Sequence, residues 1–219
     1  MREDEISKEP AKALSLLAVR PVRLEEKPGW REGMAQHHYL GFSKTAGESI
    51  LYVATLGEQW VALLSWAAAA LHVGVRESWI GWDQVARRER LNLIANNTRF
   101  LILPGVVLKN LASKTLALNV RRLSSDWEEF YGHPILVAET FVDPSRFAGT
   151  CYRAAGWKAV GQTAGFARVS KTTGFYQEHE QPKIYFARPL VKDFREKLVT
   201  RFYQKPGGFF LPWMSHNSL

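Results

Sequence analysis

One stretch in the second half of the chain, residues 139–165, constrains the fold more than any other. It overlaps an apolar run, His133–Val142, that has the length and composition of a buried strand. Asp143-Pro144 ends this strand, because proline cannot donate to the ladder. A short helix pattern leads to Gly156, which suits the left-handed position after a helix, and a second strand follows. Open α/β sheets place their chemistry at strand ends of this kind.

Two polar side chains, Asp143 and Tyr152, converge on this strand–helix junction and are candidate functional residues. Cys151 is the chain's one cysteine, which excludes an internal disulfide and a cysteine zinc cluster. Its spacing from the histidines favours a packed thiol over a nucleophile. Glu139 precedes Asp143 by four residues, so both side chains face the same side of a strand without a bulge. Glu139 is therefore a candidate second acid.

The composition favours one globular domain. The 219 residues are 46% hydrophobic and 12% aromatic, which is enough to bury a sizeable core. The best apolar run, Trp60–Val75, is interrupted by His72 and is shorter than the ~20 residues of a membrane-spanning helix. The charged first residues lack the apolar segment of an export signal. We therefore expect a cytoplasmic protein with no membrane partner.

The formal net charge of +8 favours an anionic partner. Nucleic acid, and DNA first, fits best; a phosphorylated cofactor such as coenzyme A is compatible. The alternative is that the excess of basic residues only aids solubility. The basic side chains considered for phosphate contact, which could equally be solvated, are Arg87, Arg88, Arg90, Arg168 and Lys171.

The pattern divides the chain into a polar N-terminal arm (residues 1–29), a domain (30–203) and a C-terminal tail (204–219). Apolar runs predict the strands, and apolar residues at helical spacing predict the helices. The predicted strands cover residues 50–55, 60–67, 99–104, 133–142, 158–163 and 183–189. The predicted helices cover residues 30–38, 81–96, 110–130 and 191–203, with a short one near residues 147–155.

This order of elements resembles the GCN5-related N-acetyltransferase (GNAT) fold from Trp30 to Leu190. The resemblance implies an α/β fold with a mixed, mostly antiparallel central sheet flanked by helices. It also implies that the strand before the long helix splays from its neighbour. The N-terminus of the long helix would then meet the pyrophosphate of an acyl-CoA, because its free N–H groups and its dipole favour anions.

The entry to the long helix departs from the GNAT motif, which has Gln or Arg, two residues, Gly, one residue, and then Gly or Ala. Val107 stands at the Gln/Arg position and Asn110 at the first Gly, whereas Ala112 is allowed. An acyl-CoA is therefore compatible only with a degenerate motif, and Asn110, Ala112 and Ser113 are its candidate binding residues. The alternative is that Asn110 and Ser113 only cap the helix.

A closer resemblance is to the DruA family, which is known from Druantia anti-phage systems and as a domain beside transposases in mobile elements. It rests on four motifs in order: H-H-Y-L-G, N-T-R-F-L-I-L-P, N-L-A-S, and E-T-F-V-D-P-S-R-F-A-G-T-C-Y-R-A-A-G-W-K-A-V-G-Q-T. They lie within Trp30–Leu190, which is most of the chain. The resemblance implies a role in phage defence or in a mobile element.

The chain is more distantly similar to phage Mom-type enzymes, which use a GNAT-like fold to modify adenine in DNA. The shared features are a His-Tyr pair, Asn-x-x-Ser at the entry to the long helix, and an Asp-Pro strand end followed by Gly-x-x-Tyr and Trp. The similarity implies an iron site. Carried onto this sequence, its ligands are His38, Tyr39, Asp143 and Tyr152.

Each of these residues also has a structural interpretation. His38 could satisfy carbonyl groups at the end of a helix, His37 could take its place, and Tyr39 could belong to the core. The site hypothesis predicts that His38, Asp143 and Tyr152 face one cavity between the splayed strands.

Two function classes follow. In the first, the protein is a GNAT-like transferase that modifies a nucleic-acid base, and the convergent His, Tyr and Asp residues favour it. In the second, it is a non-catalytic DNA-recognition subunit of a defence or transposition complex, with other proteins of that system as partners. The altered helix entry favours the second class.

Overall fold

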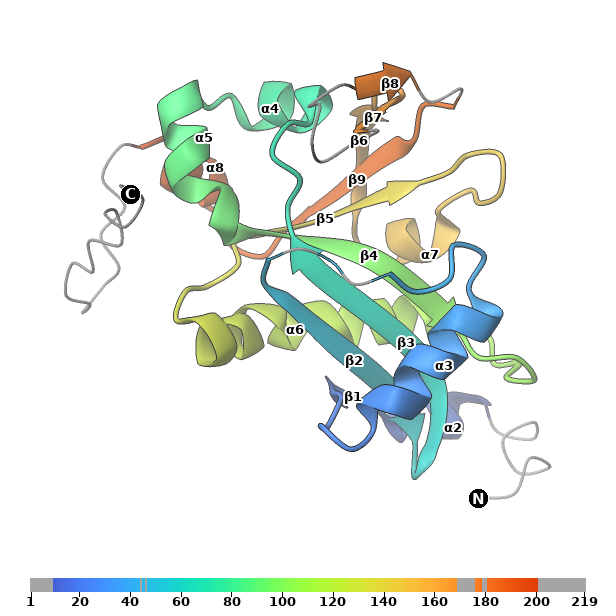
Figure 1. Ribbon diagram of the computed structural model, residues 1–219. Helices are drawn as coiled ribbons and strands as arrows, with labels where there is room; N and C mark the ends of the chain where they lie inside the picture. Colours follow the sequence, from blue (N-terminus) through green and yellow to red (C-terminus); the bar gives the residue numbers. More distant parts are fainter. Residues whose placement is uncertain (1–9, 44, 46, 169–175, 179–180, 201–219) are drawn as a thin grey trace, which may run out of the picture.

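The computed structural model describes residues 10–43, 45, 47–168, 176–178 and 181–200 (Figure 1). Its centre is a seven-stranded sheet in the order β1-β2-β3-β4-β5-β9-β6. All neighbouring strands in it are antiparallel except β4 and β5. Helices cover both faces (Figure 1). The predicted mixed, mostly antiparallel sheet flanked by helices is confirmed.

The strands of the sheet are β1 (Leu17–Pro21), β2 (Ser49–Leu56), β3 (Gln59–Ala68), β4 (Ile94–Ile102), β5 (Val137–Val142), β6 (Lys158–Gln162) and β9 (Ile184–Pro189). The helices are α2 (Pro10–Ser15), α3 (Lys27–His37), α4 (Gly74–Ile80), α5 (Gln84–Arg90), the 3-10 turn η1 (Leu91–Leu93), α6 (Leu111–Tyr131), α7 (Thr150–Ala154) and α8 (Phe194–Val199). A separate hairpin pairs β7 (Phe166–Arg168) with β8 (Tyr176–Glu178).

The prediction of a polar arm over residues 1–29 is wrong for its described part. Helix α2 and strand β1 lie there, and β1 pairs with β2 along its whole length. Leu17 and Val19 are buried while Ala18 between them is exposed, which is the alternation of a strand with one covered face. Arg122 of α6 donates to the carbonyl oxygen of Val19 and holds this edge strand. The predicted tail, residues 204–219, lies outside the described residues.

The single helix predicted over residues 81–96 is also wrong. Gly81, in the left-handed conformation, ends α4, and the Asp83 side chain accepts a hydrogen bond from Ala86 N–H at the start of α5. Strand β4 already begins at Ile94 and is paired on both sides. The strand predicted from His133 begins at Val137, and the helix predicted over residues 191–203 spans Phe194–Val199. Pairing with distant strands overrides the local apolar spacing here.

Helix α6 covers one face of the sheet, where Leu116, Leu123 and Trp127 pack into the largest hydrophobic cluster. The opposite face is covered in two places. At one end, Trp30 and Met34 of α3 pack on β2 and β3; at the other, α4, α5 and α8 cover β4, β5 and β9 (Figure 1). Among the described residues, no helix is long and apolar enough to cross a membrane.

Strands β4 and β5 pair over only three positions, of which Asn96 with Glu139 is the last. Beyond it β4 stays with β3 as far as Ile102, and β5 stays with β9 as far as Val142, so the two strands separate. The Thr140 hydroxyl donates to the carbonyl oxygen of Asn97 at 2.9 Å, which satisfies an acceptor near the point of separation. The predicted splay therefore opens at the centre of the sheet.

At this branch point Glu139 is fully buried and accepts bonds from Arg76 of α4, at 3.0 Å, and from the Tyr185 hydroxyl, at 3.0 Å. We expect Arg76→Met to lower the free energy of unfolding by about 3–5 kcal/mol, because it leaves a buried carboxylate without its cation. Urea denaturation measures the change. The double variant Arg76→Met/Glu139→Leu should recover most of the loss. A single variant as stable as the unmodified protein would contradict this role.

Candidate functional site

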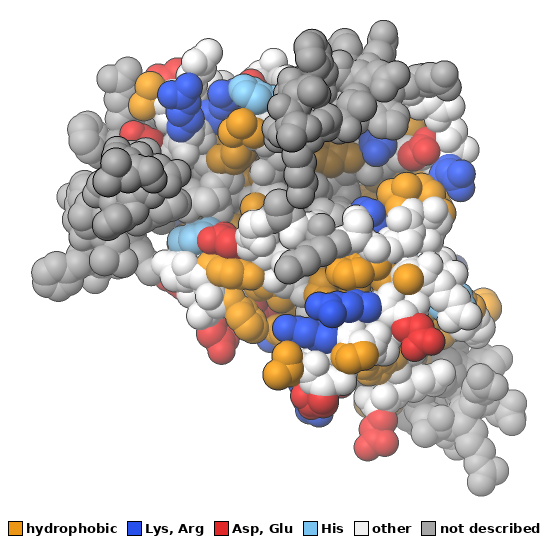
Figure 2. Space-filling model, viewed as in Figure 1, with side chains coloured by type: hydrophobic (Ala, Val, Ile, Leu, Met, Phe, Trp, Pro, Cys, Tyr) orange, Lys and Arg blue, Asp and Glu red, His pale blue; other side chains and the backbone are white. Residues whose placement is uncertain are grey.

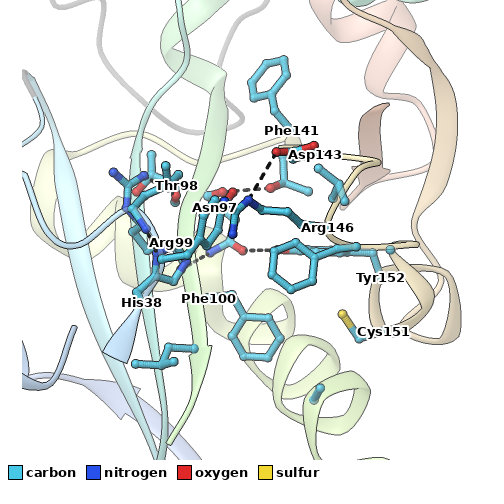
Figure 3. A pocket seen from close by; sticks show the side chains of 18 of the residues that line it. His38, Asn97, Thr98, Arg99, Phe100, Phe141, Asp143, Arg146, Cys151 and Tyr152 are labelled. Carbon is cyan, nitrogen blue, oxygen red and sulfur yellow. Dashed lines mark hydrogen bonds and ion pairs between the residues drawn. The ribbon is translucent and has the colours of Figure 1, made fainter. Parts of the chain in front are cut away.

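The opening between β4 and β5 forms a pocket of about 700 Å³ (Figure 3). Its walls are the end of α3, residues 96–102 of β4, residues 140–143 at the end of β5, and residues 146–152, which lead into α7. Ala112 of α6 and Lys183 complete it. His38, Tyr39, Asp143 and Tyr152 all line this pocket.

The pocket has walls on both sides of the sheet. Phe100 of β4 packs with the cluster under α6, whereas Leu101 packs with the cluster under α3, and both line the pocket. Figure 3 shows His38 and Arg99 across the pocket from Cys151 and Tyr152. The lining therefore comes from α3 on one face and from the α6–α7 region on the other.

His38 follows the last residue of α3 and donates its backbone N–H to the Met34 carbonyl. Its Nδ1 accepts the backbone N–H of Leu40 at 3.2 Å, so the proton of the neutral ring is on Nε2. Burial, together with the charge of Arg99, lowers the pKa of His38 to about 4. His38 is half-buried whereas His37 is exposed, so His38 is the more enclosed of the two.

Tyr39 and Phe147 form an aromatic rim, with ring centroids 5.5 Å apart and side chains 42% and 51% exposed. The Arg146 guanidinium lies 4.9 Å from the Tyr39 centroid and 3.9 Å from an Asp143 carboxylate oxygen. Asp143 also accepts bonds from the side chain and the backbone of Ser145, and these bonds lower its pKa. Asp143 is therefore ionised at neutral pH. The exposure of Tyr39 makes it a surface residue rather than a core residue.

Tyr152 lies on α7, and its hydroxyl donates to Asn97 Oδ1 at 2.8 Å across the pocket (Figure 3). Burial raises the pKa of Tyr152, so it remains a neutral phenol. Helix α7 can approach this closely because Gly149 precedes it with φ +68°, and a β-carbon there would come within 2.6 Å of the Phe186 ring. Burial also raises the pKa of Cys151, so its side chain is a thiol.

The iron ligand set implied by the resemblance stays a prediction. The described part of the chain contains no group of three His, Cys, Asp or Glu side chains that could hold a metal. Tyr152 keeps its proton and is bound to Asn97, and His38 Nδ1 is occupied by Leu40 N–H. In the set implied by the resemblance to Mom-type enzymes, His38 would have to bind through Nε2 and Tyr152 would have to give up its bond to Asn97.

Glu139 does not line the pocket. It packs against Arg76 and Tyr185 on the face covered by α4. Burial raises its pKa and Arg76 opposes this. Asp143 lies beyond the end of β5, where the chain turns, so the spacing of four does not bring the two carboxyl groups together. The prediction of Glu139 as a second acid is therefore not supported by its position.

The entry to α6 lies beside the pocket, because Ala112 is one of its lining residues. Asn110 precedes the helix with φ 65°, the one positive φ outside glycine among the described residues, and its side chain does not cap the helix. The Ser113 hydroxyl donates back to the Asn110 carbonyl. Asn110 thus has the left-handed conformation that glycine adopts readily. The first-turn N–H groups have no acceptor within the helix and suit an anion.

Two of the five basic residues predicted to contact phosphate, Arg87 and Arg90, are bonded within the protein instead. Arg87 is buried against Glu77 and His72, and Arg90 is buried against the Lys197 carbonyl. Arg88 is exposed. The side chain of Arg168 and all of Lys171 lie outside the described residues. On the face seen in Figure 2, basic side chains are scattered among acidic and hydrophobic ones rather than gathered in a stripe.

Five further polar residues line the pocket without a predicted role: Asn96, Asn97, Arg99, Arg146 and Lys183. A signal existed for Arg99, which is a charged residue inside the apolar motif N-T-R-F-L-I-L-P. An arginine in a strand that is otherwise apolar needs a polar environment.

A family model described as Druantia protein DruA matches residues 4–192. The chain belongs to the DruA family. The match begins well before Trp30, in agreement with the strand β1 in the supposed arm. No curated protein sequence matches this member of the DruA family.

Solved structures show the GNAT-like fold for this DruA-family chain. Aminoglycoside acetyltransferase AAC(6')-Ib, in complex with ribostamycin and coenzyme A, is 14% identical with a TM-score of 0.52; the similarity covers 85% of this chain and 99% of that one. Spermidine N-acetyltransferase from Vibrio cholerae, in complex with CoA and spermine, is 9% identical with a TM-score of 0.51 over 80% and 96%. At these identities the similarity concerns the fold alone.

We expect His38 to titrate near pH 4 in an NMR experiment, with its signal assigned from a His38→Gln spectrum. The unfolded chain takes up the proton near pH 6.5 and the folded protein does not, so stability falls between about pH 6.5 and 4. Arg99→Gln should move the midpoint part of the way toward 6.5, and Arg88→Gln, on the exposed side of α5, should not. A midpoint between 6 and 7 in the unmodified protein would contradict the enclosed site.

The conformation of Asn110 gives a second expectation. Asn110→Ala should destabilise the protein by about 1 kcal/mol, because a β-carbon without a local polar group is disfavoured at positive φ. Asn110→Gly should be at least as stable as the unmodified protein. Urea denaturation of the two variants measures the difference, and equal stabilities would show that the turn before α6 is not left-handed.

Proposed function

We propose that this DruA-family protein is a GNAT-like transferase that acts on a base of nucleic acid, with DNA as the first candidate, in phage defence or a mobile element. One observation carries the proposal: the pocket at the strand opening has walls on both faces of the sheet and combines cations with exposed aromatic rings. Its cations are Arg99, Arg146 and Lys183, against the one carboxylate of Asp143. This is a lining for a planar ligand that carries negative charge.

The acceptor side suits a base taken out of its stack. An extruded base requires a pocket of this order of size, aromatic or apolar faces for stacking, and polar groups for its edge. Tyr39 and Phe147 offer exposed rings at the rim, and Asn96 offers an amide. Asp143 is ionised and can accept a hydrogen bond from an exocyclic amine. Its low pKa makes it a weak base, so its role is to orient that amine rather than to remove a proton.

The donor side suits a phosphorylated acyl donor. The α6 entry offers free N–H groups at Ala112, and two acetyltransferases of similar fold were solved with coenzyme A. When bound, such a donor would supply the acyl group. Tyr152, whose hydroxyl donates to Asn97, lines this side of the pocket from α7. The chemistry proposed is of the kind carried out by Mom-type DNA modification enzymes.

A second function, that of a non-catalytic DNA-recognition subunit with other defence or transposition proteins as partners, has its own support. The pKa of His38 is lowered to about 4 and that of Asp143 is lowered as well, so neither side chain suits the role of a general base near neutral pH. Such a pocket could hold an extruded base without changing it.

Mass spectrometry of nucleosides from cells that express the protein tests the transferase. We expect a mass-shifted nucleoside with the unmodified protein and its loss with Asp143→Asn, which keeps the shape of the side chain and removes the charge. Arg31→Gln, which removes an exposed charge outside the pocket lining, is the matched control and should leave the adduct in place.

The same proteins distinguish the two functions. DNA binding that weakens log-linearly as salt rises, without any adduct in the presence of cofactor, would favour the recognition subunit. Absence of both adduct and DNA binding would exclude both functions.

A further inference from the structure

Two pocket residues on β4 have polar groups without partners. Arg99 is half-buried; its Nε donates to the Gly41 carbonyl at 3.0 Å and its Nη1 to the Thr98 carbonyl at 2.7 Å. Among the described residues, no carboxylate lies within ion-pair distance of it, and Nη2 has no acceptor. The backbone therefore fixes the direction of the guanidinium without neutralising it. Burying a cation in this way is unfavourable unless an anion joins it.

The charges around Arg99 do not supply that anion. The pocket has one carboxylate, that of Asp143 at the rim. The other titratable groups that share the pocket with Arg99 are His37, His38, Tyr39, Arg146, Cys151, Tyr152 and Lys183, and His38 is neutral. Asp143 is engaged by Ser145 and lies near Arg146. A bound anion is therefore the remaining source of negative charge for the guanidinium.

Asn96 is the second such residue. Its Oδ1 is buried and has no hydrogen-bond partner, although the side chain lines the pocket. Its neighbour Asn97 provides the contrast. Asn97 donates to the carbonyl groups of Ser65 and Arg99 and accepts from Tyr152, so its side chain holds the fold together. The open acceptor of Asn96 costs stability, and a ligand N–H would satisfy it.

We infer that Arg99 and Asn96 form a subsite for a single nucleotide: the guanidinium binds the phosphate, and the Asn96 amide oxygen accepts an N–H from the base. The two residues are three positions apart on β4, at most about 10 Å along it. A bulge at Thr98, between the pairs Ser65–Arg99 and Trp66–Asn97, lets residues three apart share a face. Asn97 and Phe100 do so on the other face, where both contact Tyr152. One nucleotide can span this length from its phosphate to the edge of its base. Arginine matches the geometry of phosphate oxygens with paired N–H donors. This subsite rests on the proposed action on nucleic acid and names its ligand unit.

Calorimetry with deoxynucleoside 5′-monophosphates and with the matching nucleosides tests the phosphate contact. We expect removal of the phosphate to weaken binding at least tenfold. Arg99→Gln should cause a similar loss for the nucleotide and little change for the nucleoside. Arg31→Gln, at an exposed residue outside the pocket lining, changes the net charge equally and should bind as the unmodified protein does. Arg99→Lys, which keeps the charge without the paired donors, should give an intermediate affinity and serves if the Gln variant does not fold.

Asn96→Leu tests the base contact with a readout that a structural role would not give. We expect a higher thermal midpoint without ligand, because the open acceptor is gone, and at least a tenfold loss of nucleotide affinity. Asn97→Leu, as the contrast, should lower the midpoint. A lower midpoint in Asn96→Leu, or undiminished nucleotide affinity in it or in the Arg99 variants, would overturn the subsite.

The outcomes separate this subsite from the transferase. Nucleotide binding that depends on Arg99, in a protein that leaves no adduct on nucleosides, would support the subsite and exclude the transferase. An adduct formed equally well by Arg99→Gln would keep the transferase and overturn the subsite. Binding of coenzyme A that is lost in Arg99→Gln, with no nucleotide binding, would assign the guanidinium to a donor and overturn the subsite as well.

Discussion

The separation of β4 from β5 after three paired positions is the constraint on which the rest of this structure depends. A sheet that opens in its middle leaves backbone groups without ladder partners, and these must be satisfied in another way. Thr140 donates to the Asn97 carbonyl, while Asn97 donates to the carbonyl groups of Ser65 and Arg99. The same side chains therefore repair the ladder and form the pocket, so the site cannot be removed without disturbing the sheet.

On the face covered by α4, a buried ion pair stabilises the place where β4 and β5 separate. Glu139 occupies the last position at which β5 pairs with β4. Its carboxylate joins Arg76 of α4 to Tyr185 of β9. Arg76 also donates to the carbonyl group of Ala70, in the connection that follows β3. One buried ion pair thus links the helix, the connection and two strands at the place where the sheet divides. Buried pairs of this kind add little net stability, but losing one member is costly.

The sequence allowed prediction of those parts of the fold whose signal is local. The long helix and the strands of the β2–β3 hairpin have clear apolar periodicity, and Asp143 and Tyr152 lie within one motif. Strand β1 was not predicted, because it has only five residues and charged residues surround it. The start of β4 was not predicted, because the apolar side chains of residues 91–94 have helical spacing. The strands that pair with it, β3 and β5, are distant in the sequence. The role of Glu139 could not be predicted, since its partner Arg76 is 63 residues away.

Net charge alone could not locate the functional surface either. Three arginines that contribute to the value of +8, Arg76, Arg87 and Arg90, are buried and bonded to carboxylate or carbonyl groups of the protein. Their charge stabilises the fold and is not presented to a ligand. Arg99 differs because no carboxylate among the described residues pairs with it, whereas even Arg90 has Glu89 at 3.9 Å. The bonds of Arg99 go only to neutral carbonyl groups, which orient the guanidinium but leave its charge uncompensated. What distinguishes a binding arginine in this chain is therefore the kind of acceptor that the protein itself provides, and not the degree of burial.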